Sequence, residues 1–254
     1  YQLNNGEVEE ESQIVEIDGT WELIDISDGL HDNAVWKIGR HGDRFFILTS
    51  DGLNEISLFP YTVIPNSFED FKNTTILDMS IISQESIALC DDTQNKYRSI
   101  EECHSHCSSK CLKKNVNELI LSTTKGLTKI NFETNMETFL SPRACSQVEI
   151  QDFELFCLER GISRLDMLDG SMEFEQIITD DRIRNFTLSN HYIWVNLIDR
   201  AHLKNLNNGE SWYYNQGDGI QGSNIYEIGN IDDWIYFISE KGVSLYNWGK
   251  FHVN

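Results

Sequence analysis

The chain has 254 residues and a formal net charge of −21, because 41 Asp and Glu residues stand against 20 Lys and Arg residues. A surface this acidic repels DNA, RNA and anionic lipid, since those partners require Lys and Arg to neutralise phosphate. Basic partners, divalent cations and neutral glycans remain compatible with it, and no apolar run is long enough to span a membrane.

The chain opens with a polar segment. Residues 1–12 are polar and acidic and contain no aromatic strand, so we assign them to an acidic N-terminal segment. Residues 13–17 and 21–24 then predict a hairpin that has the pattern of the third and fourth strands of a larger unit. No first or second strand of that unit precedes the hairpin.

An internal repeat relates residues 28–52 to residues 218–242, which align without a gap. Chance is a poor explanation for so many matched apolar and glycine positions. The matched positions are Asp28-Gly29-Leu30 with Asp218-Gly219-Ile220, Val35-Trp36 with Ile225-Tyr226, Ile38-Gly39 with Ile228-Gly229, and Gly52-Leu53 with Gly242-Val243.

Each unit predicts a meander of short strands. In the first copy, residues 34–38, 45–49 and 53–59 are rich in apolar, aromatic and β-branched residues, and glycine-containing turns separate them. The second and third strands recur at residues 118–122 and 126–130, at 153–157 and 161–165, and at 192–195 and 202–206, while fourth strands begin at Met136, Met172, Trp212 and Phe251.

Four antiparallel strands in each unit of roughly forty residues predict an all-β chain folded as a β-propeller over residues 13–254. A β-sandwich is the alternative, but it does not predict a fixed period. We count about five whole blades and the outer half of another.

The half blade raises the question of how the ring closes, because an open ring exposes a sheet edge and an unpacked blade face. In one arrangement, residues 13–24 complete the final blade of a closed five-blade ring. In the other, another chain or a further part of a parent protein supplies the missing inner strands. We favour the second arrangement, because blade lengths near forty residues fit six or seven blades as well as five.

Four of the six cysteines crowd an insertion at about residues 84–116, and the other two lie on what we predict to be the first two strands of one blade. An even count predicts disulfides and an oxidising location: secreted, cell-surface or periplasmic. If residues 103–111 form a helical turn, at least one of its thiols must bond to a cysteine elsewhere; the pairing otherwise stays open. The cysteines are Cys90, Cys103, Cys107, Cys111, Cys145 and Cys157.

Two alternatives apply to these cysteines. Cys103, Cys107 and Cys111, with Cys90 as a fourth ligand, could bind zinc. Cys145 and Cys157 could remain two buried thiols. We predict disulfides, with no metal and no cofactor, because the acidic composition and the even count fit a secreted chain. Asn73 and Asn185 each begin a sequon and are candidates for N-glycosylation.

Other candidate residues favour structural roles. Asp166, Asp169, Asp180 and Asp181 fall in predicted loops and could act as acid–base groups or bind calcium, but no Asp-x-Asp-x-Asp-Gly loop is present, so we interpret them as solvated turn residues. None of the seven histidines accompanies a Gly-x-Ser-x-Gly motif. The tryptophans at 36, 194 and 234 lie inside predicted strands, and we expect them in the core.

The repeat resembles the propeller repeat of bacterial two-component-regulator sensors. The residues that carry the resemblance are Asp28-Gly29-Leu30, Asn33, Val35, Ile38, Phe45, Thr49 and Gly52-Leu53. The middle three copies match poorly, and Phe46 or Ile47 stands where that family usually has Trp. Residues 205–212 are also similar to the Asp-box of sialidases, which is a hairpin brace and not a catalytic element.

We therefore predict a non-enzymatic extracellular or periplasmic recognition module, a sensor or receptor ectodomain that binds a protein or glycan ligand. A glycan-active propeller enzyme, either a glycoside hydrolase or a lyase, is the alternative. The expected partners exclude nucleic acid and membrane insertion of this segment, and they include another chain or parent segment that completes the propeller.

Overall fold

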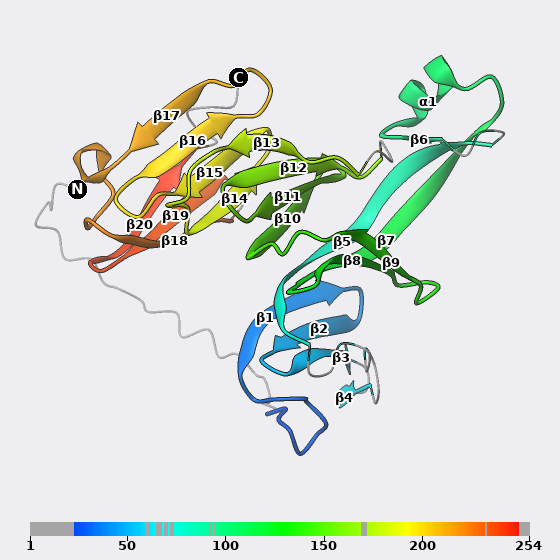
Figure 1. The fold of residues 1–254 in the computed structure, drawn as a ribbon, viewed down its shortest axis with the longest axis horizontal. Helices are drawn as coiled ribbons and strands as arrows, with labels where there is room; N and C mark the ends of the chain where they lie inside the picture. The colour runs from blue at the N-terminus through cyan, green and yellow to red at the C-terminus, as the bar shows by residue number, and fades with distance from the viewer. Residues whose placement is uncertain are drawn as a thin grey trace, which may run out of the picture.

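The computed structural model describes residues 23–58, 61–64, 68, 71, 74–91, 93, 95–168, 172–231 and 233–248. These residues form five antiparallel sheets that follow one another as the blades of a β-propeller (Figure 1). The predicted fold class is therefore confirmed. Within the described ranges, no helix has the length and apolar character needed to cross a membrane.

Blades 1 and 2 are meanders in which each strand pairs with the next, and blade 2 has an additional short strand, β6, on the free edge of β5. The strands of blade 1 are β1 (Val35–His41), β2 (Arg44–Thr49), β3 (Gly52–Leu58) and β4 (Tyr61–Val63); those of blade 2 are β5 (Ile76–Cys90), β6 (Lys96–Tyr97), β7 (Cys111–Thr123), β8 (Gly126–Asn131) and β9 (Glu137–Ser141), with helix α1 (Ile100–His106) between β6 and β7.

Blades 3 and 4 have four strands each, and blade 5 has three among the described residues. Their strands are β10 (Gln147–Gln151), β11 (Glu154–Leu158), β12 (Ile162–Asp166) and β13 (Glu175–Ile178) in blade 3, β14 (Asn185–Ser189), β15 (Tyr192–Asn196), β16 (Ala201–Asn205) and β17 (Ser211–Tyr214) in blade 4, and β18 (Ile225–Ile231), β19 (Trp234–Ser239) and β20 (Gly242–Asn247) in blade 5, which the short 3-10 helix η2 (Gln216–Asp218) precedes.

The hydrophobic core lies between blades. Strand β15 is buried on both faces, because blade 4 is packed between two neighbours. Ile193 and Val195 belong to the apolar cluster shared with blade 3, whereas Tyr192 and Trp194 belong to the cluster shared with blade 5. Alternation along each inner blade therefore separates two apolar faces, one toward the preceding blade and one toward the following blade.

Three sequence-based expectations about individual residues are wrong. The fourth strand of blade 3 begins at Glu175 and not at Met172. Cys145 precedes β10 instead of lying on it. Trp36 and Trp234 are exposed, in contrast to the buried Trp194. Trp234 lies on the outward face of the last blade, whereas Trp36 lies at a bulge of β1 and is exposed like Tyr226, its counterpart in the repeat. Apart from Leu23 and Ile24, the predicted opening hairpin lies outside the described residues, as does the predicted strand at 251–253.

In blades 1 to 4, one position on the innermost strand carries a polar side chain that reaches the next blade. Lys37 Nζ lies 2.7 Å from Asp78 Oδ1, and Asp78 Oδ2 accepts the N–H of Val148 at 2.8 Å. Gln147 accepts the N–H of Phe186 at 3.0 Å and donates to the carbonyl of the same residue at 2.7 Å. These contacts satisfy backbone groups on strand edges that face the centre of the propeller.

Glu149 strengthens the same set of contacts between blades 3 and 4. Its carboxylate accepts the N–H of Leu188 at 3.0 Å and the side-chain amide of Gln147 at 2.9 Å. Burial raises the pKa of Glu149 to about 7, and the carboxylate of Asp78 adds to this rise, while the N–H of Leu188 and the charge of Lys37 oppose it.

Blades 1 and 5 are the two ends of this series. The innermost strands pack in the order β1, β5, β10, β14 and β18. Among the described residues, no strand of blade 5 packs on blade 1 in the way that neighbouring blades pack, and Figure 1 shows the two blades at opposite ends of an open arc.

Replacing Gln147 tests the contacts between inner strands. We expect Gln147→Ala to lower the free energy of unfolding by about 2 kcal/mol, because it leaves the N–H and C=O of Phe186 without their partner. Glu227 occupies the same position of the last blade, so Glu227→Ala should change stability by less than about 0.5 kcal/mol. Urea titrations of both variants provide the measurement, and equal losses would contradict this account.

The raised pKa of Glu149 predicts a pH-dependent stability. The folded state binds this proton more tightly than the unfolded chain, so the wild-type protein loses stability as pH rises from 4.5 through about 7. Between about pH 5 and about pH 8, we expect the free energy of unfolding of Glu149→Gln to fall by about 2 kcal/mol less than that of the wild-type protein. Thermal melts across this range measure it, with the exposed turn variant Glu133→Gln as the control that should behave like wild type.

Candidate functional site

A long hairpin carries the cysteine-rich insertion away from blade 2. Strands β5 and β7 stay paired from the blade out to Cys90 and Cys111, and α1 and β6 lie at the far end (Figure 1). Ser99 caps α1, because its hydroxyl accepts the N–H of Glu102 at 3.1 Å. The described part of the insertion is thus an extension of the first two strands of a blade.

Two disulfides close the far end of the insertion. Cys90 is bonded to Cys107, and Cys103 is bonded to Cys111. Both strands of the hairpin are thereby tied to α1 and the residue that follows it. The sulfur atoms of Cys103, Cys107 and Cys111 lie within 4.8 Å of one another, and the two neighbouring disulfides account for that proximity.

A third disulfide lies in the core between blades 2 and 3. Cys145, just before β10, is bonded to Cys157 in β11, and both residues are fully buried. Ser122 of β7 accepts the N–H of Cys145 at 2.9 Å and donates to its carbonyl at 2.7 Å. This bridge therefore stabilises the base on which the insertion stands.

Peptide mapping without reduction tests these pairs. We expect three cross-linked species that contain Cys90–Cys107, Cys103–Cys111 and Cys145–Cys157, and no labelling by iodoacetamide in the unfolded, unreduced protein. Labelling of the four insertion cysteines, together with unfolding on treatment with a zinc chelator, would contradict the pairing and favour a metal site.

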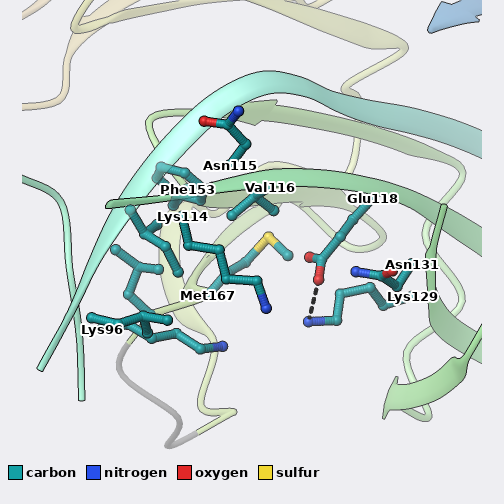
Figure 2. Close-up of a pocket in the computed structure, with 12 residues that line it drawn as sticks. Lys96, Lys114, Asn115, Val116, Glu118, Lys129, Asn131, Phe153 and Met167 are labelled. Atoms are coloured by element: carbon teal, nitrogen blue, oxygen red, sulfur yellow. Dashed lines mark ion pairs between the residues drawn. The ribbon is translucent and has the colours of Figure 1, made fainter. Parts of the chain in front are cut away.

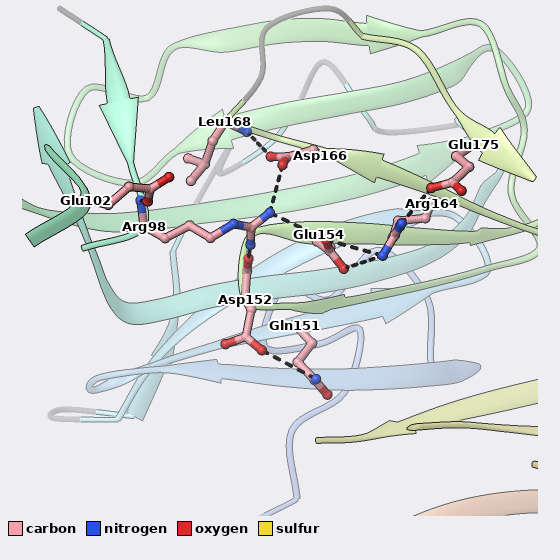
Figure 3. A network of polar contacts seen from close by, with 9 residues as sticks. All are labelled: Arg98, Glu102, Gln151, Asp152, Glu154, Arg164, Asp166, Leu168 and Glu175. Atoms are coloured by element: carbon pink, nitrogen blue, oxygen red, sulfur yellow. Dashed lines mark hydrogen bonds and ion pairs between the residues drawn. The ribbon is translucent and has the colours of Figure 1, made fainter. Parts of the chain in front are cut away.

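Arg98 fastens the insertion to blade 3. Its guanidinium donates to the backbone carbonyl of Asp152 and lies 2.7 Å from Asp166 Oδ2 and 3.4 Å from Glu154 Oε1 (Figure 3). Glu154 in turn lies 3.3 Å from Arg164. A single exposed ion pair contributes little, but a guanidinium with three acceptors on one blade fixes an orientation.

The turn that receives Arg98 holds a strained backbone. Asp152 and Phe153 both have positive φ angles, 51° and 61°, in the two-residue turn between β10 and β11. Such a turn suits Asn or Gly, and a bulky residue in this region is unusual. Phe153 is held there because its ring is buried against Ile82 and Ile87 of β5. Strained backbone residues cluster at functional sites, so this turn is a candidate part of such a site.

A cavity of about 80 Å³ lies beside that turn, at the base of the insertion. Its apolar wall comes from the β5–β7 hairpin of blade 2 and from blade 3. Its polar lining is rich in lysine, as Figure 2 shows. We call it the lysine pocket. Its lining residues are Ile87, Leu89, Lys96, Lys114, Asn115, Val116, Glu118, Lys129, Asn131, Phe153, Met167 and Leu168.

The lysine pocket is locally positive in an acidic chain. Lys96, Lys114 and Lys129 extend their amino groups toward the same space, and the one carboxylate among the lining residues, Glu118, is paired with Lys129 at 3.1 Å (Figure 2). Partial burial lowers the pKa of Lys96, and repulsion by Lys129 and Lys114 lowers it further, while Glu118 opposes the change. A bound anion would relieve that repulsion.

A second cavity, of about 370 Å³, lies between blades 4 and 5 and has an aromatic lining. Burial, reinforced by Tyr246, raises the pKa of Tyr214 in its wall to about 12. The cavity also borders β20, whose outer edge is where blades 1, 3 and 4 have a fourth strand. We therefore regard it as space beside the edge of a blade of which the described residues form three strands, rather than as a ligand site.

Most of the candidate polar residues from the sequence analysis do not lie together in the structure. Asp166 lies in the network around Arg98, and Asp180 is bonded to Arg182, whose guanidinium lowers the pKa of that carboxyl to about 2. Asp169 and Asn73 lie outside the described residues. Asn185 begins β14, with its amide nitrogen 3.5 Å from the carbonyl of Ile228, and its glycosylation stays a prediction.

Sequence reasoning missed the lysine pocket. One signal was present: residues 110–129 contain five lysines and a single acidic residue, in a chain that is acidic elsewhere. The pattern did not indicate which side chains meet, because Lys96, Lys114 and Lys129 come from three strands, β6, β7 and β8.

No protein-family profile and no curated protein matches this sequence. The structure is similar to PorZ, described as an essential bacterial surface component of the type-IX secretion system of Porphyromonas gingivalis, with a TM-score of 0.55, 12% identity, and coverage of 87% of this chain and 25% of that chain. It is also similar to the extracellular domain of the putative hybrid two-component system BT4673 from B. thetaiotaomicron, with a TM-score of 0.54, 12% identity, and coverage of 86% of this chain and 29% of that chain.

These neighbours establish the propeller fold, and they confirm at that level the resemblance to two-component sensor propellers. The chain spans less than a third of the length of each of these two proteins.

Proposed function

We propose that this chain is a non-enzymatic recognition module that acts outside the cytoplasm, as a sensor or receptor ectodomain, and that its ligand presents an anionic group to the lysine pocket. The observation that carries this proposal is the gathering of three lysines around one carboxylate in a chain of net charge −21.

Two observations support the location. Three disulfides persist in secreted, surface or periplasmic proteins and are rare in the cytosol. PorZ is described as a surface component and the BT4673 segment as an extracellular domain, and both share this fold.

The pocket lining supports an acidic sugar as the ligand. Phe153, Met167 and Leu168 offer apolar contact for ring carbons, while Lys96 and Lys114 offer donors to a carboxylate or sulfate. The acidic surface elsewhere repels extended polyanions, so a ligand with one projecting anionic group is favoured over a uniformly charged polymer.

Binding to an array of carboxylated, sulfated and neutral glycans tests this proposal. We expect carboxylated or sulfated glycans to bind, the affinity to fall with added salt, and Lys96→Gln/Lys114→Gln to weaken binding by about tenfold or more. Lys113 precedes Lys114 in β7 and is not among the lining residues, so Lys113→Gln should bind like wild type. Equal loss in both variants, or preference for neutral glycans, would contradict the proposal.

A glycan-active enzyme is the second candidate, and the raised pKa of Glu149 favours it, since a proton-holding carboxyl suits an acid catalyst. Its carboxylate is, however, already bonded to Gln147 and Leu188. Turnover of chromogenic glycosides that disappears in Glu149→Gln would favour the enzyme over the recognition module.

A further inference from the structure

The two end blades each expose an apolar face. We call the side of a blade that packs on the following blade its trailing face, and the opposite side its leading face. On blade 5, β19 and β20 present the trailing face to solvent. On blade 1, β1 presents the leading face to solvent, whereas Ile47 and Ile56 of the same face are covered by Ile24, Leu30 and Val63. The apolar residues of the trailing face are Ile231, Trp234, Tyr236, Ile238, Val243 and Leu245.

The trailing face of blade 5 can be compared with that of blade 4 residue by residue. Val243 and Leu245 are 60% and 65% exposed. Their pairing with the neighbouring strand places them at the positions of Ala201 and Leu203, which are 0% and 1% exposed beneath blade 5. Blade 5 thus carries apolar side chains where blade 4 is covered by a neighbour.

The leading face of blade 1 shows the same contrast. The gapless repeat places Val35 and Ile38 on Ile225 and Ile228. Val35 and Ile38 are 45% and 59% exposed, whereas Ile225 and Ile228 are 1% and 2% exposed, because blade 4 covers them.

Polar groups on the two faces are complementary. Glu227 occupies in blade 5 the position of Asp78 in blade 2 and of Gln147 in blade 3. Asp78 and Gln147 each accept a backbone N–H of the next innermost strand. The carboxylate of Glu227 instead lies 3.5 Å from the hydroxyl of Tyr236 in its own blade. Ile38 occupies the position of those N–H donors, Val148 and Phe186. Arg40, two residues beyond Ile38, gives the leading face a positive charge, whereas Glu227 gives the trailing face a negative charge.

We propose that these two faces bind each other between two copies of this chain, so that the trailing face of blade 5 packs head-to-tail on the leading face of blade 1 of a second copy. The occupant is a second copy because this one sequence contains both halves of a blade interface. Its pattern is already realised between blades 4 and 5. The two halves lie at opposite ends of the arc, and the described parts of blades 1 and 5 do not pack on each other (Figure 1).

Blocking one face at a time tests this assembly. Leu245→Glu places a charge on the trailing face and Ile38→Glu on the leading face, both at exposed positions that do not disturb the fold. Met136→Glu, at an exposed apolar residue between β8 and β9 on neither face, is the control. Sedimentation velocity and circular dichroism melts follow association and folding.

We expect the wild-type chain and Met136→Glu to associate increasingly with concentration, since a head-to-tail contact closes into rings or continues as an open series. Leu245→Glu alone and Ile38→Glu alone should remain monomeric. Mixed in equal amounts they should form a 1:1 complex of two chains and nothing larger, because each variant retains the face that the other has lost.

A wild-type chain that stays monomeric at every concentration overturns the proposal, as does a mixture of the two variants that forms no complex. Glycan binding by the lysine pocket, between blades 2 and 3, should be the same in both variants. Failure of either proposal therefore leaves the other standing.

Discussion

The exposed backbone edge of each innermost strand is the constraint on which the propeller depends. Strands within a blade satisfy one another, but the edge that faces the centre must find other partners. A polar residue from the preceding blade supplies them: Asp78 reaches β10, and Gln147 and Glu149 reach β14. The angle between neighbouring blades is thereby fixed at the centre, while the apolar clusters fill the space farther out.

That rigid interface explains where a binding site could form. Blade 2 extends its first two strands into the insertion, and Arg98 holds the insertion against the β10–β11 turn of blade 3. The lysine pocket lies between these two anchored parts, with Phe153 of the strained turn in its wall. Of its three lysines, Lys129 is held by the ion pair with Glu118, whereas Lys96 and Lys114 are exposed.

The same repeated geometry makes the ends of the series conspicuous. A blade in the middle has two covered faces, whereas the trailing face of blade 5 and the β1 part of the leading face of blade 1 are exposed. Their exposed apolar residues match covered residues elsewhere in the chain, so exposure here reflects position in the series and not a change in the type of residue. PorZ and the BT4673 extracellular domain share the fold over 87% and 86% of this chain, and the match covers 25% and 29% of their own length.

The sequence by itself determined the all-β class, the meander of strands, the repeat and an insertion rich in cysteine. These features depend on period-two alternation and turn residues, which are local. Only the tertiary structure decided the pairing of Cys90 with Cys107, the exposure of Trp234, and the meeting of Lys96, Lys114 and Lys129. Each of these depends on which strands become neighbours, and the strand pattern alone, being nearly the same in every blade, cannot distinguish a covered face from an open one.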